Sequence, residues 1–295
     1  YGTSEFLKAI GASKVVIGVS GGIDSAVNAA LYRSILPAEN ILLVNTPTRY
    51  NSELTKGLAA ELAKNLGCQL LTVPIGDFID ETADALEGLP LPDDTVHLTG
   101  FMKENMQARD RSSRILAALS AAFGGIFTCN ANKAETTVGY STLYGDQSGF
   151  LAALADLWKY QVYALAHYMN TTVYGREVVP QGIIDIVPSA ELSSAQNVDE
   201  GKGDPIKYPY HDFLFRSFVE RWQKATPEDL LEWYKAGTVE ANLGCEAGLV
   251  AKYFPTAADF IQDLERWWNL FSGMAIAKRS EEHTSELQSR QCISY

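Results

Sequence analysis

Over the first seventy residues, short and largely apolar runs alternate with segments in which apolar residues recur at helical spacing. Residues 15–19 and 41–46 are such runs, and they are typical of strands buried on both faces. After the first run, apolar side chains recur at three- and four-residue spacing, as at Ala26 and Ala30, which predicts a helix. A third run starts at Gln69. The order strand, helix, strand, helix, strand predicts parallel strands with right-handed crossovers.

The same patterns continue through the rest of the chain. Leucines recur every four residues at Leu54, Leu58 and Leu62, which predicts a helix over residues 52–66 with one buried face. The spacing also predicts helices over residues 101–123 and 151–169, a fourth strand over 126–129 and helices from residue 208 onward. We therefore expect an α/β protein with a doubly wound, mainly parallel five-stranded sheet and a helical C-terminal region.

Two glycines lie between the first strand and the first helix of this pattern, in Ser20-Gly21-Gly22. Glycine permits positive φ and has no Cβ, so an anion can contact the backbone N–H groups of such a turn. The helix that follows adds unpaired amides and the positive end of its dipole. The turn therefore predicts a phosphate site at the carboxyl end of the first strand, where doubly wound sheets bind ligands.

Asp24 follows this turn directly. A carboxylate beside a bound phosphate repels it. The arrangement is favourable when a divalent cation bridges the two groups, and Mg²⁺ usually binds through one or two carboxylates plus phosphate oxygens. The alternative is that Ser20 or Asp24 only caps the helix and that the glycines only make a tight turn.

Composition excludes some classes of function. The formal net charge is −12, which argues against a nucleic-acid partner, because such binding needs clustered Lys and Arg. The sequence has neither an apolar stretch of membrane-spanning length nor a signal-peptide pattern at its start, so we expect no membrane partner. The four cysteines form no C-x-x-C pair, and reduced thiols in the cytoplasm are the expectation.

Polar residues at three later places in the chain are further candidates for the site. Arg109 and Arg111 belong to a basic helical run that is either a solvated helix face or, near a phosphate site, a bidentate anion ligand. Glu135 is either a second carboxylate for the cation or an ordinary residue at a helix start. Lys159, taken alone, is typical of a surface lysine.

Ser20-Gly21-Gly22-Ile23-Asp24-Ser25 resembles the SGGxDS loop of the N-type ATP pyrophosphatases. Five blocks in order are similar to the NAD synthetases, particularly to the synthetase domain of the glutamine-dependent type. The blocks are residues 20–25 (SGGIDS), 107–109 (QAR), 132–146 (with NKAE, GY and YGD), 157–163 (LWKYQVY) and 187–192 (VPSAEL). The resemblance extends over about residues 5–278.

The resemblance implies a set of site residues. For ATP it implies Gly18, Val19, Ser20, Gly21, Gly22, Ile23, Asp24, Ser25, Asn130, Lys159 and Ser189, with Asp24 and Lys159 in catalysis. For Mg²⁺ it implies Asp24 and Glu135, and for deamido-NAD it implies Arg109, Tyr140, Asp146 and Lys278. The chain departs from the smaller ammonia-dependent relatives at Leu143 and Asn130, where those have lysine and threonine.

The resemblance further implies an activity. It is the ATP-dependent amidation of deamido-NAD to NAD through an adenylate, with release of AMP and pyrophosphate, by a cytoplasmic homodimer. Ammonia would come from solution or from an N-terminal amidase domain outside this sequence. Two alternatives remain open: another N-type ATP pyrophosphatase that adenylates a different acceptor, and a non-catalytic ATP-binding module.

The end of the chain has a different character. Residues 279–289 (RSEEHTSELQS) resemble the in-frame translation of a common sequencing-adapter oligonucleotide. We therefore expect residues 1–278 to form the synthetase domain and residues 279–295 to be a non-native tail.

Overall fold

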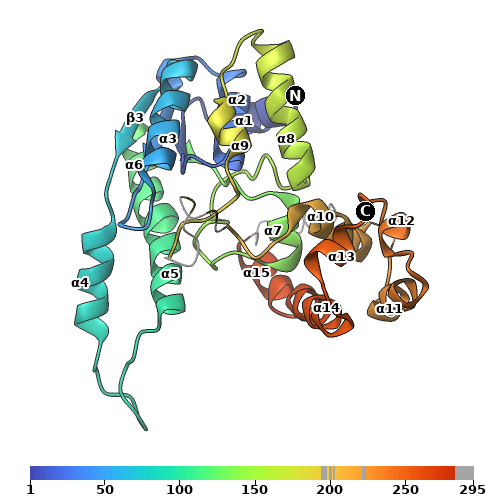
Figure 1. The fold of residues 1–295 in the computed structure, drawn as a ribbon. Helices are drawn as coiled ribbons and strands as arrows, with labels where there is room; N and C mark the ends of the chain where they lie inside the picture. The colour runs from blue at the N-terminus through green and yellow to red at the C-terminus, as the bar shows by residue number, and fades with distance from the viewer. Residues whose placement is uncertain (194–197, 199–200, 202, 221–223, 283–295) are drawn as a thin grey trace. The chain divides into compact units, whose positions relative to one another are not determined.

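The computed structural model describes residues 1–193, 198, 201, 203–220 and 224–282, with side chains as far as residue 278 (Figure 1). Residues 283–295, most of the predicted non-native tail, lie outside the described residues. The chain divides into two compact units. The first comprises Tyr1–Ala131, Thr142–Leu154 and Val162–Asp204, and the second Asn132–Ser141, Ala155–Gln161 and Pro205–Tyr295.

A parallel sheet forms the centre of the first unit. Its strands are β1 (Val15–Gly18), β2 (Ile41–Asn45), β3 (Gln69–Thr72) and β4 (Ile126–Phe127). Their order is β3-β2-β1-β4, and Val15 pairs with Ile41 on one side and with Ile126 on the other. All residues of β2 are buried, as a strand covered on both faces requires. The predicted parallel α/β sheet is confirmed.

The described sheet has four strands, whereas the sequence predicted five. Among the described residues after β4, a single parallel bridge forms, between Cys129 and Ala152. Two backbone hydrogen bonds accompany it, from Phe150 N to Phe127 O and from Cys129 N to Leu151 O. The chain then enters a turn at residue 153, so the pairing ends before a fifth strand forms.

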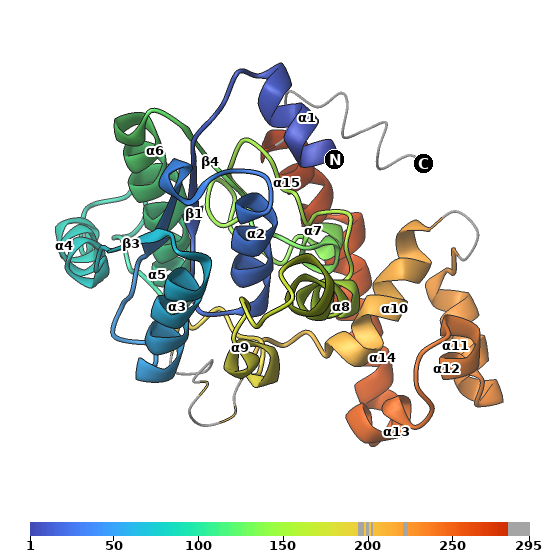
Figure 2. The ribbon, with the colours of Figure 1, turned by 90° about the horizontal axis from the view of Figure 1, so that it is seen from above.

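Helices cover both faces of this sheet, which is the doubly wound arrangement (Figure 2). Helices α2 (Ile23–Arg33) and α3 (Glu53–Leu66) pack on one face, and η2 (Asp110–Leu116) and α6 (Ala117–Phe123) on the other. The other helices that begin or lie in this part of the chain are α1 (Gly2–Ala9), η1 (Ala38–Asn40), α4 (Gly76–Leu86), α5 (Gly100–Arg109), α8 (Lys159–Tyr168), η3 (Met169–Val173) and α9 (Gln181–Asp185).

Helix α3 shows where the sequence pattern was inexact. Ser52 caps it by accepting a hydrogen bond from Thr55 N, and Gly67 ends it. Leu58 and Leu62 are buried, but Leu54 is 51% exposed, although the leucine spacing placed it on the same face. A spacing of four residues overshoots one helical turn by about 40° per step, so the row of leucines drifts away from the sheet.

The helix predicted over residues 101–123 is present as α5, η2 and α6, but η2 is a π-helix. A π segment adds a residue to a turn and turns the following side chains relative to an α-helix. This changes which residues of the basic run face the sheet. Hydrophobic spacing alone does not reveal such a segment.

The second unit is helical, as predicted. Its core includes Leu214, Phe215, Phe260 and Trp267, and the rings of Phe215 and Trp267 meet edge to face with centroids 5.2 Å apart. The described helices are α7 (Lys133–Val138), α10 (Tyr208–Val219), α11 (Pro227–Ala236), α12 (Val239–Leu243), α13 (Leu249–Tyr253), α14 (Ala257–Ser272) and α15 (Met274–Glu282).

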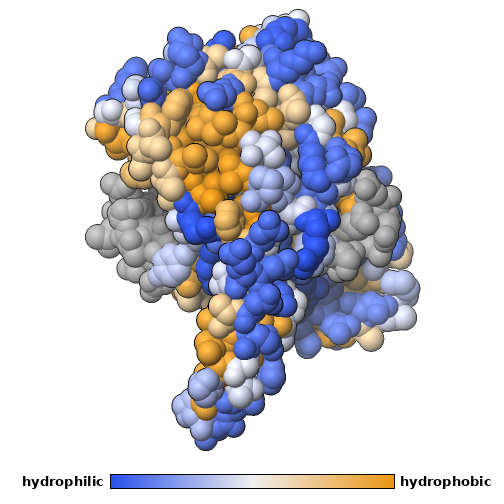
Figure 3. Space-filling view, turned by 90° about the vertical axis from the view of Figure 1, so that its left-hand side faces the viewer, coloured by the Kyte–Doolittle hydropathy of each residue, from blue (hydrophilic) through white to orange (hydrophobic). Residues whose placement is uncertain are grey.

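Apolar side chains gather on the face of the first unit that carries β3 and α6 (Figure 3). Leu71 and Val73 from the β3 region and Leu119 and Phe123 from α6 are only partly buried there. A membrane-spanning helix is not found within the described part of the chain, because no helix there is both long and apolar enough.

Candidate functional site

The glycine turn lies between β1 and α2 and is held by two serine hydroxyls. Ser20 Oγ accepts a hydrogen bond from Gly22 N at 3.2 Å, and Ser25 Oγ donates to Gly22 O at 3.0 Å. The N-cap residue of α2 is Gly22, so the N-cap position itself provides no side-chain cap. A helix that starts at a glycine turn is suited to binding an anion.

Gly21 places this turn against helix α3. Its φ is +91°, and a Cβ at this position would lie 2.3 Å from Thr55 O. Only glycine allows both the backbone conformation and the close approach. The glycine turn and the first turn of α3 therefore pack directly on each other.

The carboxyl ends of β1 and β4 are joined by two asparagines. Asn130 Nδ2 donates to Gly18 O at 2.7 Å, and Asn28 Nδ2 donates to Asn130 Oδ1 at 2.7 Å. The structure thus brings together Gly18 and Asn130, two of the residues expected at ATP. Asn28 was not predicted, although it follows Asp24 by one helical turn and is polar in an apolar helix. Its Oδ1 is buried without a hydrogen-bond partner among the described residues.

The segment with Ser189 is anchored to the start of α3 through Glu191. The Glu191 side chain is 3% exposed, and its carboxylate accepts hydrogen bonds from Ser52 N, Asn51 Nδ2 and Thr55 Oγ1 at 3.1, 3.2 and 2.8 Å. Ser189 Oγ in turn accepts from Glu191 N at 3.2 Å. Glu191 has a φ of +47°, which is uncommon outside glycine and is found at functional sites. This anchor was not predicted.

Arg111 lies beside the same anchor. Its Nε donates to Thr46 O and one terminal nitrogen donates to Asn51 Oδ1, both at 3.4 Å. Burial lowers the pKa of Arg111 to about 10, and the negative charges of Asp146 and Glu191 oppose this shift. Arg111 is therefore a partly buried cation at the carboxyl end of β2 and not part of a solvated helix face.

Helix α5 and the loop after residue 141 bring Arg109 and Asp146 to one region of the first unit. Arg109 Nε donates to Leu143 O at 3.1 Å. Asp146 Oδ1 accepts from Thr142 N at 2.8 Å, which orders the loop around its own carboxylate. Ser113 Oγ also donates to Tyr144 O. Arg109 and Asp146, both expected to contact deamido-NAD, thus lie on a helix and on the loop that this helix holds.

In the second unit, Glu135, Lys159 and Tyr208 meet. Lys159 is 2% exposed, so it is not a surface lysine. Its Nζ lies 3.8 Å from Glu135 Oε1 and 4.6 Å from the centroid of the Tyr208 ring. Tyr208 Oη donates to Glu135 Oε1 at 3.1 Å, and Asn132 Nδ2 donates to the same oxygen at 2.8 Å. Glu135 also forms the capping box of α7 with Asn132, so it is a helix-start residue and a partner of Lys159 at once.

Tyr140 and Lys278, two more residues expected at deamido-NAD, are neighbours in the second unit. Lys278 Nζ donates to Gly139 O at 2.8 Å and to Ser141 O, the two carbonyl groups that flank Tyr140. A Cβ at Gly139 would lie 2.8 Å from Ala275 Cα, so this loop packs directly on α15.

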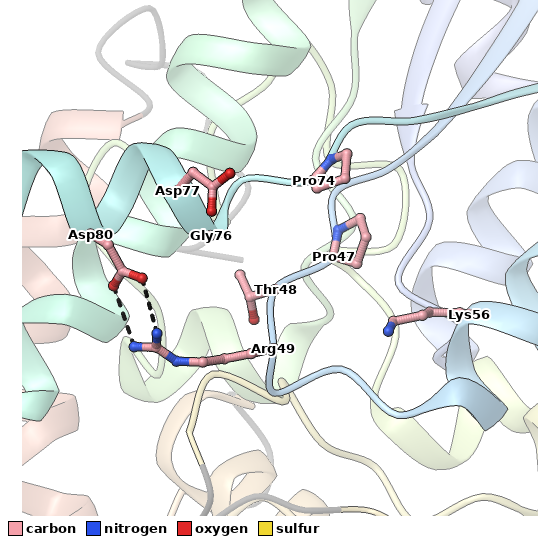
Figure 4. Close-up of a pocket in the computed structure, with 8 residues that line it drawn as sticks. All are labelled: Pro47, Thr48, Arg49, Lys56, Pro74, Gly76, Asp77 and Asp80. Atoms are coloured by element: carbon pink, nitrogen blue, oxygen red, sulfur yellow. Dashed lines mark hydrogen bonds and ion pairs between the residues drawn. The ribbon is translucent and has the colours of Figure 1, made fainter.

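A small pocket opens in the first unit at the carboxyl ends of β2 and β3 (Figure 4). Its volume is about 320 Å³, near the lower limit for small-molecule sites. Arg49 spans part of it with two hydrogen bonds to Asp80, at 2.9 and 3.3 Å. The lining residues are Pro47, Thr48, Arg49, Lys56, Pro74, Gly76, Asp77 and Asp80.

A model of the NAD synthase family matches residues 3–240. The chain belongs to the NAD synthase family. The similarity that SGGIDS and the four later blocks predicted is thereby confirmed. The glutamine-dependent NAD(+) synthetase of Xylella fastidiosa (strain 9a5c) is 39% identical over 243 residues, which are 81% of this chain and 42% of that protein. The chain thus spans about two fifths of the length of the curated relatives it matches.

Solved structures agree with this assignment. The NMN synthetase from Francisella tularensis has a TM-score of 0.61 at 25% identity, covering 83% of this chain and 92% of that one. The glutamine-dependent NAD+ synthetase from Acinetobacter baumannii, in complex with ADP, has a TM-score of 0.55 at 26% identity, covering 81% and 43%. The fold of the NAD synthases is therefore present in this chain.

The side chains of this NAD synthase chain fit a magnesium ion only when a bound nucleotide supplies further ligands. Within the described residues, no three His, Cys, Asp or Glu side chains are grouped so as to hold a metal. Glu135 Oε1 accepts hydrogen bonds at 2.8 and 3.1 Å, and Oε2 accepts a longer one, of 3.4 Å, from Asn132 N. Mg²⁺ takes few protein ligands when phosphate oxygens supply the rest, so a carboxylate such as that of Glu135 would suit it in a nucleotide complex.

Proposed function

We propose that this chain catalyses the ATP-dependent amidation of deamido-NAD to NAD, with ammonia as nitrogen donor and with AMP and pyrophosphate as the other products. The observation that carries the proposal is the glycine turn of a NAD synthase chain. It is closed by Ser20 and Ser25, and it precedes a helix whose N-cap is glycine and whose first turn contains Asp24. These features support a phosphate site with a carboxylate beside it.

The chemistry follows from what an amidation needs. A carboxylate is a poor electrophile, because attack by ammonia would have to expel oxide. Transfer of AMP from ATP to the deamido-NAD carboxylate converts that oxygen into a leaving group and releases pyrophosphate. Ammonia then attacks the carbonyl carbon and displaces AMP. The protein contributes alignment and charge neutralisation.

The chain's own residues divide this work. The ATP phosphates contact the turn from Gly18 to Ser25, with Asn130 and Ser189 as further ATP contacts, and the ammonium group of Lys159 neutralises charge on the departing pyrophosphate. Deamido-NAD contacts Arg109, Tyr140, Asp146 and Lys278. Asp24 and Glu135 would hold Mg²⁺, which when bound supplies positive charge to the phosphates.

The assembly and the ammonia source extend the proposal. We infer a homo-oligomer, most simply a dimer in the cytoplasm, and the partly buried apolar side chains at Leu71, Val73, Leu119 and Phe123 support an association surface. Light scattering during size-exclusion chromatography measures the oligomeric state directly. Ammonia comes from solution or from an amidase domain of a longer protein.

The test is incubation of the purified chain with ATP, Mg²⁺, deamido-NAD and ammonium, with NAD, AMP and pyrophosphate as readouts. We expect equimolar NAD and AMP from the wild type and neither from Asp24→Ala, which should keep the wild-type circular dichroism spectrum. A parallel panel replaces deamido-NAD by nicotinate mononucleotide. AMP formation with another acceptor alone favours a different N-type ATP pyrophosphatase, and ATP binding without AMP formation favours a non-catalytic module.

A further inference from the structure

Tyr208 contacts both members of the charged pair in the second unit. Its hydroxyl donates to Glu135 Oε1 at 3.1 Å, and its ring lies beneath Lys159 Nζ at 4.6 Å from the centroid. The distance from Lys159 Nζ to Glu135 Oε1 is 3.8 Å. A direct ammonium–carboxylate hydrogen bond is about 2.7–2.9 Å long. Lys159 Nζ and Glu135 Oε1 are therefore adjacent without being hydrogen-bonded to each other.

The position of Tyr208 is fixed by the fold. It is the first residue of α10, it is 7% exposed, and α10 packs against α7, the helix that carries Glu135. Because the ring is buried against a neighbouring helix, it has little freedom to move away from Lys159. Tyr208 is thus a rigid group between a flexible ammonium chain and a carboxylate.

The contacts made by Tyr208 weaken direct pairing in two ways. The hydroxyl donates to Oε1, the oxygen that faces Lys159 and that also accepts from Asn132 Nδ2 at 2.8 Å, so that oxygen already has two hydrogen bonds. The ring face attracts the ammonium group and gives it a favourable place away from the carboxylate. Without Tyr208, a buried Lys159 and Glu135 would close into a direct ion pair, because low local dielectric strengthens their attraction.

We propose that Tyr208 is a positioning residue that holds the ion pair of Lys159 and Glu135 at 3.8 Å and prevents it from closing into a direct hydrogen bond. Such an open pair is more easily separated when phosphate oxygens bind the ammonium group and a divalent cation binds the carboxylate. This inference rests on the proposed function for the roles of Lys159 and Glu135. It adds a residue that no sequence motif indicated, 73 positions from Glu135 in the chain.

The first experiment measures metal binding without turnover. Tyr208→Phe keeps the ring and removes the hydroxyl. Mn²⁺ binding in the presence of a non-hydrolysable ATP analogue, followed by electron paramagnetic resonance, should weaken about tenfold, because the metal must then separate a direct ammonium–carboxylate hydrogen bond, which is stronger than one between neutral groups. The matched control is Tyr210→Phe, a buried tyrosine of the same helix whose ring packs on Phe254, and it should bind Mn²⁺ as the wild type does.

A double-mutant cycle tests the cause of the effect. If closure onto Lys159 is what weakens the metal site, Tyr208→Phe should change Mn²⁺ binding less than about twofold in a Lys159→Met background. Wild-type Mn²⁺ binding by Tyr208→Phe overturns the inference. If Tyr208→Phe weakens Mn²⁺ binding as much in the Lys159→Met background as in the wild type, the inference is also overturned, because the tyrosine would then act on Glu135 alone.

Steady-state kinetics separate this inference from the proposed function. In an active chain, Tyr208→Phe should raise the Mg²⁺ concentration for half-maximal rate about tenfold and leave kcat at saturating Mg²⁺ within about threefold. A chain that makes no NAD contradicts the proposed function, while the Mn²⁺ cycle still decides whether Tyr208 positions the pair. Full activity with an unchanged Mg²⁺ requirement in Tyr208→Phe contradicts the inference alone.

Discussion

A methyl group added at Gly21 would be directed into the backbone of helix α3. It would lie 2.3 Å from Thr55 O, whereas ordinary van der Waals contact at these positions is 3.4–4 Å. Gly21 also has a φ of +91°, a conformation that L side chains rarely adopt. Gly21→Ala therefore combines backbone strain with an overlap that no side-chain rotation relieves.

These two costs can be estimated separately. Placing an alanine in the left-handed region costs about 1–2 kcal/mol. Relieving an overlap with packed backbone costs about 1–3 kcal/mol. The sum, about 2–5 kcal/mol, is a large fraction of the 5–15 kcal/mol that is typical of native stability. For a domain of this size it corresponds to a fall in Tm of roughly 5–15 °C.

The assay is urea denaturation, together with ATP binding by calorimetry, on three alanine variants. Gly57→Ala is the matched control: it lies inside α3, its Cβ meets nothing within 4 Å, and it should gain about 0.5–1 kcal/mol from helix propensity. Gly22→Ala has an ordinary φ of −93° and meets only the Ser20 hydroxyl at 3.3 Å. It should unfold like the wild type but bind ATP more weakly, because its methyl group would hinder the approach of a phosphate to the amides of the turn.

The result that refutes this reasoning is simple to state. If Gly21→Ala unfolds within about 0.5 kcal/mol of the wild type, the turn does not pack on α3 as described. If all three variants lose the same stability, glycine content and not the close approach to Thr55 determines the effect.

Three more variants test other parts of the structure. Glu191→Gln should lose about 1–3 kcal/mol of unfolding free energy, because a buried carboxylate with three donors becomes an amide, whereas exposed Glu53→Gln should change it by less than about 0.5 kcal/mol. Burial lowers the pKa of His211 below its ordinary 6.5, so below that pH the unfolded chain binds more protons and wild-type stability falls with acid. In urea titrations from near pH 7 to about pH 5 that loss should be smaller in His211→Gln. Lys278→Met should raise the KM for deamido-NAD about tenfold without a matching rise for ATP, and equal rises in steady-state assays would argue against a role at the acceptor.

Local patterns were sufficient for the parts of the fold that depend on neighbouring residues. The parallel strands at residues 15–18 and 41–45 and the glycine turn after the first strand follow from apolar runs and from Ser20-Gly21-Gly22. The family assignment also follows from short blocks in order. Each of these features is encoded within about ten residues, so the sequence displays it directly.

Other features required the folded chain. The number of strands depended on how far residues 149–152 follow β4, and the exposure of Leu54 depended on the drift of a helical row against the sheet. The burial of Lys159 was not predicted, because its contacts with Glu135 and Tyr208 come from distant parts of the sequence. Such outcomes depend on packing between segments, which periodicity does not contain.

The sequence by itself determined that this is an α/β chain of the NAD synthase family with a glycine turn after its first strand. Only the tertiary structure decided that Glu191 anchors the start of α3 and that Tyr208 joins Lys159 to Glu135. Ser52 and Glu191 are 139 positions apart, and Glu135 and Tyr208 are 73 apart. The physical reason is that a hydrogen bond between distant residues exists only after the chain has folded, whereas a turn or a strand is specified by adjacent residues.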